Sequence, residues 1–263
     1  AFQPQLSADG HRVIGMEALA RWTPPGAGPV PPARFIPAIE AAGRSEQLSE
    51  TMLGAALAAL KGWDAAGLAV PRVGVNFAAA ELRRPGLPDR VQRQLDRFGL
   101  TPDRLAVEVL ETVVAGHGEE VVIRNLAALS RMGCAIDLDD FGTGHAAIGA
   151  IRRFSVGRLK IDRSFVAGID RDPDQRRLVA AIVTLADTLG LETLAEGVET
   201  AGERAVAARL GCHGVQGYGL ARPMDRAAAT DWLAARGGGA AQAVAPSDAR
   251  PRTDRATVAT AAE

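Results

Sequence analysis

The chain has few cysteines, few aromatic side chains and no excess of charge of either sign. Its two cysteines, Cys134 and Cys212, lie far apart among apolar or small residues and have no partner at the spacing of a metal site, so we expect buried thiols in a reducing compartment. Aromatic residues make up only 4 % of the chain, so packing must rely on small and aliphatic side chains. The net charge of -1 gives no basic surface of the kind that nucleic-acid-binding proteins carry, and direct DNA binding is not expected.

Long apolar runs are also missing. No stretch is apolar for the roughly 18 or more residues of a membrane span, and the start of the chain lacks the basic and apolar segments of an export signal, which predicts a cytoplasmic location even if a parent protein is membrane-anchored. The chain starts with AFQPQL, without an initiator methionine, so we expect a piece of a longer protein. Residues 1–236 are predicted to form one domain, and the aperiodic, Pro- and Ser-containing stretch 237–263 is predicted to be a disordered tail or linker.

Short β-rich runs alternate with helical patterns along residues 1–236. This alternation favours an α/β fold with a parallel sheet. An open, doubly wound sheet is less well supported, because GTGHAAIG lacks the glycine spacing of a dinucleotide-binding turn and no phosphate-binding lysine motif is present. We therefore predict a closed barrel. After the strand-like start of the chain, the expected strands lie in residues 13–21, 72–78, 104–111, 135–141, 157–162, 192–198 and 214–218.

Polar residues interrupt these apolar runs, each late in its strand. An uncompensated charge in a buried strand costs several kcal/mol, so one exception would mean little but a series needs a reason. In a closed barrel the series would converge on the rim formed by the carboxyl ends of the strands, where the active sites of barrel enzymes lie. The series consists of Glu17, Asn76, Glu108, Asp139, Asp140, Lys160, Glu196 and Gln216.

This set contains five carboxylates, two amides and one lysine. The carboxylates would repel one another strongly in one pocket, so a cation is expected among them. Oxygen ligands without His or Cys favour Mg²⁺ or Mn²⁺, as one ion or as two ions bridged by Asp139. Neighbouring strand residues point to opposite faces, so Asp140 is expected where the strand gives way to the glycine turn. Helix capping explains any one of these residues as well, but not Lys160 and Asn76 within strands.

The order of the motifs resembles that of a known family. GMEALARW, VGVNFA, VEVLET, DDFGTG, LKIDRSFV, AEGVET and QGYGLARPM follow one another as in the bacterial EAL domain, and the resemblance covers about residues 1 to 235. Seven separated motifs in order are specific, whereas EAL alone would not be. The resemblance implies a modified TIM-type (β/α)8 barrel with one antiparallel strand. It also implies hydrolysis of cyclic di-GMP to linear pGpG.

The resemblance also assigns roles to residues of this chain. It implies that some of them bind the metal ions and that others contact the substrate or take part in catalysis. Lys160 matches the lysine near the attacking water or phosphate, Glu196 matches a general base or ligand of a second metal, and Glu111 matches a glutamate that steadies the loop after DDFG. The implied metal ligands are Glu17, Asn76, Glu108, Asp139, Asp140 and Glu199, and the implied substrate contacts are Arg21, Gln3 and Gln216. The implied catalytic residues are Glu196, Lys160 and Asp140.

The chain departs from the family pattern at a few positions. The loop after DDFGTG reads His145, Ala146 and Ala147 instead of a tyrosine and two serines. Leu110 replaces a threonine, and Gly157 replaces an acidic residue. In the family this loop couples metal binding to dimerisation, so a homodimer is expected but its strength is in question. The expected parent protein carries additional regulatory domains.

Three functions remain open, and the resemblance implies the first two. The first is a cyclic di-GMP phosphodiesterase dependent on Mg²⁺ or Mn²⁺, inhibited by Ca²⁺ and more active toward alkaline pH. The second is a catalytically weak or inactive module that senses cyclic di-GMP. The third is a barrel enzyme of the enolase kind with Lys160 as base, which explains the carboxylates but neither the EAL nor the QGY motif.

Overall fold

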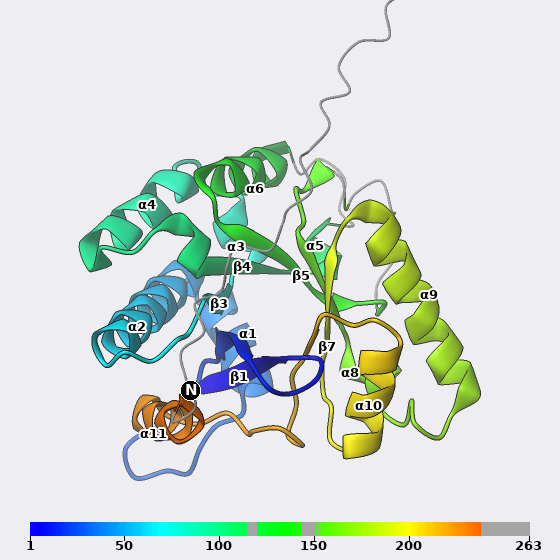
Figure 1. Ribbon diagram of the computed structural model, residues 1–263. Helices are drawn as coiled ribbons and strands as arrows, with labels where there is room; N and C mark the ends of the chain where they lie inside the picture. Colours follow the sequence, from blue (N-terminus) through cyan, green and yellow to red (C-terminus); the bar gives the residue numbers. More distant parts are fainter. Residues whose placement is uncertain (115–119, 144–150, 152, 238–263) are drawn as a thin grey trace, which may run out of the picture.

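The computed structural model describes residues 1–114, 120–143, 151 and 153–237. Its eight strands form a closed barrel in the order β1 to β8, with helices around it (Figure 1). The predicted closed barrel is confirmed, and each predicted strand is present in shorter form or with the same bounds. The strands are β1 Phe2–Ser7, β2 Val13–Ala18, β3 Val73–Asn76, β4 Leu105–Leu110, β5 Ala135–Phe141, β6 Arg158–Ile161, β7 Glu192–Ala195 and β8 Gly214–Val215.

One strand runs against the others, as the family resemblance implied. β1 is antiparallel to both of its neighbours, with Gln3 opposite Glu17 of β2 and Leu6 opposite Val215 of β8. Only residues 8–12 connect β1 to β2, which suits an antiparallel pair because a parallel pair needs a long crossover. The pairs from β2 to β8 are all parallel.

The helices lie between successive strands and cover the outside of the barrel (Figure 1). Local signals define several ends. Asp172 caps α9 by accepting from the amides of Asp174 and Gln175, and Gly190 ends it in the left-handed conformation. The helices are α1 Pro32–Ala41, α2 Ser45–Ala65, α3 Ala79–Leu82, α4 Leu87–Phe98, α5 Glu111–Val114, α6 Glu120–Met132, α8 Arg163–Val166, α9 Pro173–Leu189, α10 Ala201–Arg209 and α11 Arg226–Gly237, with a 3-10 turn at Pro102–Arg104.

An apolar layer joins the helices to the outer face of the barrel. Trp63 of α2 is fully buried, packs edge-on against Phe2 with ring centroids 5.2 Å apart, and donates from its indole nitrogen to the Thr230 hydroxyl at 3.0 Å. This contact ties α2 and α11 to β1. Burial of large apolar side chains in this layer stabilises the barrel from outside.

The inside of the barrel is polar by contrast. Arg158 of β6 donates to the side-chain oxygen of Gln5 of β1 at 3.0 Å, and β6 and β1 are not neighbours, so this contact crosses the interior. Glycine leaves room for such side chains: a Cβ at Gly74 would overlap the Glu108 carboxylate. The strands therefore enclose a space that charged side chains fill from within.

Residues 238–263 lie outside the described residues, so the disordered tail from residue 237 stays a prediction, as does the limit of the domain at residue 236. Among the helices that the structure describes, none combines the length and apolar character of a membrane-crossing segment.

Candidate metal centre and active site

The rim residues predicted from the sequence meet at one end of the barrel. Glu17, Asn76 and Glu108 lie on β2, β3 and β4, and Lys160 lies on β6. Glu196 directly follows β7 and Gln216 directly follows β8. The parallel strands thus carry these side chains to the rim, as predicted. We call the five carboxylates Glu17, Glu108, Asp139, Asp140 and Glu196 the acidic site.

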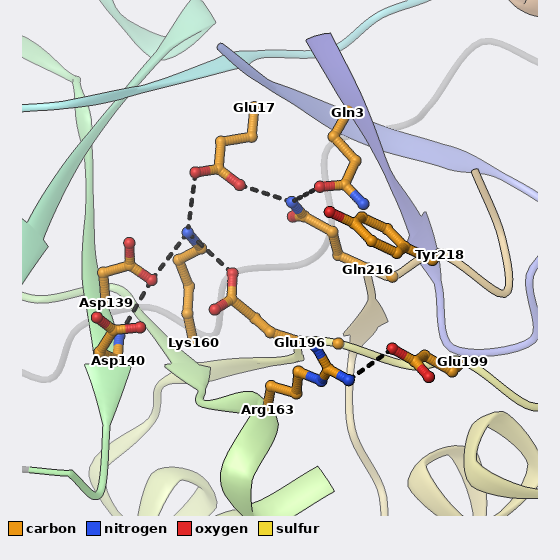
Figure 2. A pocket seen from close by; sticks show the side chains of 12 residues that line it. Gln3, Glu17, Asp139, Asp140, Lys160, Arg163, Glu196, Glu199, Gln216 and Tyr218 are labelled. Carbon is orange, nitrogen blue, oxygen red and sulfur yellow. Dashed lines mark hydrogen bonds and ion pairs between the residues drawn. The ribbon is translucent and has the colours of Figure 1, made fainter. Parts of the chain in front are cut away.

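Lys160 lies at the centre of the acidic site. Its ammonium nitrogen is 2.9 Å from Asp139, 3.0 Å from Glu196, 3.1 Å from Glu108 and 3.7 Å from Glu17. Figure 2 shows the side chain rising from β6 toward Glu17, Asp139 and Glu196. Burial alone would lower the pKa of Lys160, but the surrounding carboxylates raise it well above its usual value. The lysine is therefore a fixed positive charge.

A β-bulge explains the neighbouring aspartates. Leu138 pairs with Leu159 and Phe141 pairs with Ile161, so Asp139 and Asp140 together lie opposite Lys160. Asp140 has φ 54°, a left-handed conformation that is rare outside glycine. The extra residue lets both carboxylates serve one cavity. Asp140 was expected to leave the regular strand, and its backbone does so, although the strand itself continues to Phe141.

Two groups of carboxylates are close enough to hold a cation each. Oxygen atoms of Glu17, Glu108 and Asp139 lie within 4.8 Å of one another, and so do those of Asp139, Asp140 and Glu196. Asp139 belongs to both groups, which is the arrangement expected for a bridging ligand. The set matches the oxygen chemistry that Mg²⁺ and Mn²⁺ prefer.

Two hydrogen-bonding details also fit a cation. Within the described residues, Glu108 Oε1 is buried and has no hydrogen-bond partner. Asn76 donates from its amide nitrogen to Glu17 at 3.1 Å and to Glu108 at 3.2 Å, so a rotation of its side-chain amide would bring the carbonyl oxygen to the same place. The residues present can therefore supply oxygen ligands to a divalent ion.

The acidic site carries more negative charge than one lysine offsets. Burial raises the pKa of Glu196 to about 8 although Lys160 opposes this, and burial together with the Asp139 charge raises that of Asp140 to about 6. Burial and then the charge of Glu17 raise the pKa of Glu108 well above its usual value. Burial acts the same way on Glu17, but Lys160 and the Gln216 amide outweigh it and hold its pKa below the usual value.

Two cavities open on the acidic site. The first, of about 290 Å³, is bounded by Glu17, Asp139, Asp140, Lys160 and Glu196 on one side and by Gln3, Arg163, Glu199, Gln216 and Tyr218 on the other (Figure 2). The second, of about 370 Å³, shares Glu17, Asp139 and Asp140 with the first and extends between α1 and α2. Its other walls are mainly apolar. An elongated ligand could thus lie on both sides of the carboxylates.

The structure places the remaining predicted residues around this centre. Gln216 donates to Glu17 at 2.6 Å and to Gln3 at 3.2 Å, so both glutamines join the site. Glu111 accepts from the Gly142 amide at 2.8 Å, directly after the bulge, in the position expected for a residue that steadies this loop. Arg21 lines the second cavity, and its guanidinium donates to the neighbouring Ala20 carbonyl at 2.8 Å.

Glu199 is not brought together with the other predicted metal ligands. Its carboxylate pairs with Arg163 at 2.8 Å on the outer wall of the first cavity, and both side chains are about half exposed. Its role as a ligand stays a prediction that this geometry does not favour. His145, Ala146 and Ala147 lie outside the described residues, whereas Leu110 is 43 % exposed and lines the second cavity.

Sequence reasoning missed several polar residues of the site and of the layer below it. Arg163 and Tyr218 line the first cavity directly. Arg163 begins the short helix α8, and Tyr218 lies in the predicted strand 214–218 but beyond the end of β8 in the structure. Asp137 and Arg158 come two residues before Asp139 and Lys160, and Gln5 comes two residues after Gln3 on the antiparallel β1. The period of two along a strand was the signal that could have found this deeper set.

Comparisons with known proteins identify the family. The model of the EAL domain family matches residues 1–223. The chain belongs to the EAL domain family. It is 38 % identical over 85 % of its length to the bifunctional diguanylate cyclase/cyclic di-GMP phosphodiesterase MucR and 31 % identical over 85 % to the cyclic di-GMP phosphodiesterase RocR, both from Pseudomonas aeruginosa. The match covers 32 % of MucR and 56 % of RocR, so the chain spans only part of these relatives.

Solved structures give the same picture. A MucR phosphodiesterase in complex with c-di-GMP has a TM-score of 0.80 and 38 % identity, covering 85 % of this chain and 90 % of that one. The EAL domain of Mycobacterium smegmatis DcpA has a TM-score of 0.74 and 28 % identity, covering 89 % and 94 %. The modified TIM-type barrel is thus shown as the fold of this EAL domain, and the family is one of cyclic di-GMP phosphodiesterases that depend on metal ions.

Proposed function

We propose that this EAL domain hydrolyses cyclic di-GMP to linear pGpG with the help of Mg²⁺ or Mn²⁺. The observation that carries the proposal is that two sets of three carboxylates, each close enough to hold a cation, share Asp139 and lie around Lys160. The names of MucR and RocR, and the c-di-GMP complex of MucR, support the choice of substrate. The complete set of predicted rim residues favours an enzyme over a binding module without activity.

The residues divide into two candidate ligand sets. Glu17, Asn76, Glu108 and Asp139 would hold one cation, and Asp139 with Asp140 would hold a second, beside which Glu196 is either a further ligand or the general base. When bound, such a cation supplies a water of lowered pKa and offsets the charge of a phosphate. Ca²⁺ is expected to inhibit, because its longer and less regular coordination disturbs this geometry.

Lys160 and Glu196 are the candidates for the chemical step. Lys160 keeps a fixed positive charge beside the cavity, where it would offset the charge that develops on a phosphate oxygen. Glu196 contacts Lys160 at 3.0 Å, and we assign it the proton of the attacking water. A general base is most effective when its pKa lies near the working pH. Burial raises the pKa of Glu196 without a cation, and a cation on Asp139 would lower it again.

The outer wall of the first cavity suits a guanine base. Arg163 and Glu199 offer a donor fork beside a carboxylate, which matches the O6 acceptor and the neighbouring N1–H and N2–H donors of guanine. Adenine presents a different pattern, with a donor in place of O6. Tyr218 is half exposed at the same wall, with the Arg222 guanidinium 4.6 Å from its ring centroid, and it can stack on a base. We infer that this wall binds one guanine of the substrate.

We further propose a homodimer, a cytoplasmic location, and regulatory domains in the parent protein. The relatives support the last point, because the matched region is about a third of MucR and 29 % of the oxygen sensor protein DosP of Escherichia coli, to which the chain is 33 % identical. The homodimer rests on the sequence resemblance alone, and the location rests on the sequence, which shows neither a membrane span nor an export signal.

The proposal is tested by incubating purified protein with cyclic di-GMP and Mg²⁺, Mn²⁺, Ca²⁺ or EDTA and separating the nucleotides by chromatography. Linear pGpG should accumulate with Mg²⁺ or Mn²⁺ only. Glu196→Gln should lower kcat by roughly a hundredfold or more, the contribution typical of a general base. Folded wild-type protein that forms no pGpG under these conditions would refute the enzyme.

Glu192→Gln is a matched control. Glu192 is the exposed first residue of β7, whereas Glu196 follows the last residue of the same strand. The same substitution is thus placed at opposite ends of one strand. Glu192→Gln should keep wild-type turnover, and an equal loss in both variants would show that the effect of Glu196→Gln is not local to the site.

A further inference from the structure

Below the acidic site, a buried pair of opposite charges lies inside the barrel. Asp137 of β5 and Arg158 of β6 come two residues before Asp139 and Lys160, which places them about 7 Å deeper at roughly 3.3 Å per residue. Arg158 donates from Nε to Asp137 Oδ2 at 3.0 Å and also from Nη2, which in addition donates to Gln5 at 3.0 Å. The two side chains are 3 % and 0 % exposed.

Stability alone does not explain an ion pair at this depth. Two charges lose their hydration there, and apolar side chains of similar volume usually fill such a place at no loss of stability. Burial alone would lower the pKa of Arg158, but the Asp137 carboxylate holds it above its usual value, so the guanidinium stays charged. The position of the pair offers a better explanation.

The pair joins β5 and β6 directly before the bulge that forms the site. Asp137 pairs with Arg158 and Leu138 with Leu159, and the register then shifts until Phe141. A bulge interrupts the ladder of backbone hydrogen bonds, so the strands are held less firmly there. The double contact of Arg158 with Asp137 acts between these two strands just below the interruption, and Gln5 holds the guanidinium from across the barrel.

We propose that Asp137 and Arg158 are positioning residues for the metal centre. By clamping β5 to β6 beneath the bulge, they hold the Asp139 and Asp140 carboxylates at the separations that divalent cations require. The inference rests on the metal site of the proposed function but not on its substrate. Neither residue lines either of the two cavities.

The test replaces the pair by apolar residues of similar size, as Asp137→Leu with Arg158→Met. Mn²⁺ binding is followed by the electron paramagnetic resonance signal of free Mn²⁺, and the melting temperature is measured in EDTA. We expect Mn²⁺ affinity to fall roughly tenfold or more, in the range typical for residues that orient metal ligands, while the melting temperature is kept or raised. With cyclic di-GMP, kcat should fall more than KM changes. Unchanged Mn²⁺ affinity would overturn the inference.

Two further variants guard against misfolding and general effects. Arg158→Lys keeps the charge but cannot contact Asp137 twice and Gln5 at once, so it should lose part of the Mn²⁺ affinity with little loss of stability. Glu81→Leu with Arg90→Met removes a partly buried ion pair between α3 and α4, together with the contact of Arg90 to Glu46, and should leave Mn²⁺ affinity unchanged. The inference would also be overturned if this control lost as much Mn²⁺ affinity as the Asp137→Leu/Arg158→Met variant. If that variant does not fold, wild-type Mn²⁺ affinity in Arg158→Lys would overturn the inference instead.

The outcome separates this inference from the proposed function. Wild-type protein that binds Mn²⁺ but cleaves no cyclic di-GMP would refute the phosphodiesterase, and the role of Asp137 and Arg158 would then be decided by the same binding test. If the wild type cleaves cyclic di-GMP and the Asp137→Leu/Arg158→Met variant binds Mn²⁺ as tightly as the wild type, the phosphodiesterase is supported and the role of Asp137 and Arg158 is refuted.

Discussion

The replacement Lys160→Met gives the sharpest test of the electrostatics at the barrel rim. The lysine is 1 % exposed and lies 2.9 to 3.7 Å from four carboxylates. With an effective dielectric constant of about 20, each contact is worth about 5 kcal/mol before the cost of burying the charges. Most of that gain is offset by desolvation, and removing one partner of a buried ion cluster typically leaves a net cost of about 3–5 kcal/mol.

We therefore expect Lys160→Met to lower the free energy of unfolding by about 3–5 kcal/mol in EDTA, which corresponds to a melting temperature lower by roughly 6–20 °C for a domain of this size. Mn²⁺ should restore much of the loss, because a divalent cation can offset the same carboxylates. Saturation to about 100 times the dissociation constant adds about 2.7 kcal/mol. The assay is thermal unfolding by circular dichroism with EDTA or Mn²⁺, together with urea unfolding in both.

The only other lysine of the sequence provides the control. Lys61 is exposed on α2, and Lys61→Met should change the free energy of unfolding little in either condition. A loss below about 1 kcal/mol for Lys160→Met in EDTA, the size of an exposed ion pair, would contradict the view that this lysine neutralises the site. Equal stabilisation of wild type and Lys160→Met by Mn²⁺ would show that the metal and the lysine do not act on the same carboxylates.

Three other results are expected. Gly74→Ala should weaken Mn²⁺ binding, measured by calorimetry, because the new Cβ would overlap Glu108 Oε1 and must displace that carboxylate; unchanged affinity would show that Glu108 is not held by this contact. Burial raises the pKa of Cys134 to about 12 and that of Cys212 to about 11, so both stay protonated near neutral pH and should react with a thiol reagent only after denaturation, and rapid labelling of the folded protein would show that the thiols are accessible. Glu199→Gln should weaken cyclic di-GMP binding in calorimetry and reduce its preference over cyclic di-AMP, and an unaltered preference would remove Glu199 from base recognition.

The sequence alone predicts the rim of the barrel because each rim residue marks the end of an apolar strand. Glu17, Glu108 and Lys160 are visible as single polar letters in β-rich runs, and the parallel order of the strands places such ends together. The adjacent aspartates even predict a departure from regular strand geometry, which the bulge at Asp140 confirms.

Contacts across the barrel are beyond such reasoning. Arg158 reaches Gln5 although 153 positions separate them in sequence and their strands are not neighbours. Glu199 shows that a motif also does not fix the direction of a side chain. Its motif suggests a metal ligand, but in the structure its carboxylate pairs with Arg163. Side-chain direction in loops follows local backbone geometry, which strand periodicity does not describe.

The most direct test of the metal centre is a crystal of this chain soaked in Mn²⁺ and measured at a wavelength where manganese scatters anomalously. We predict an anomalous peak in contact with Glu17, Glu108 and Asp139, and at higher Mn²⁺ concentration a second peak beside Asp140 that shares Asp139 with the first. Well-ordered rim carboxylates without any anomalous peak among them would contradict the account.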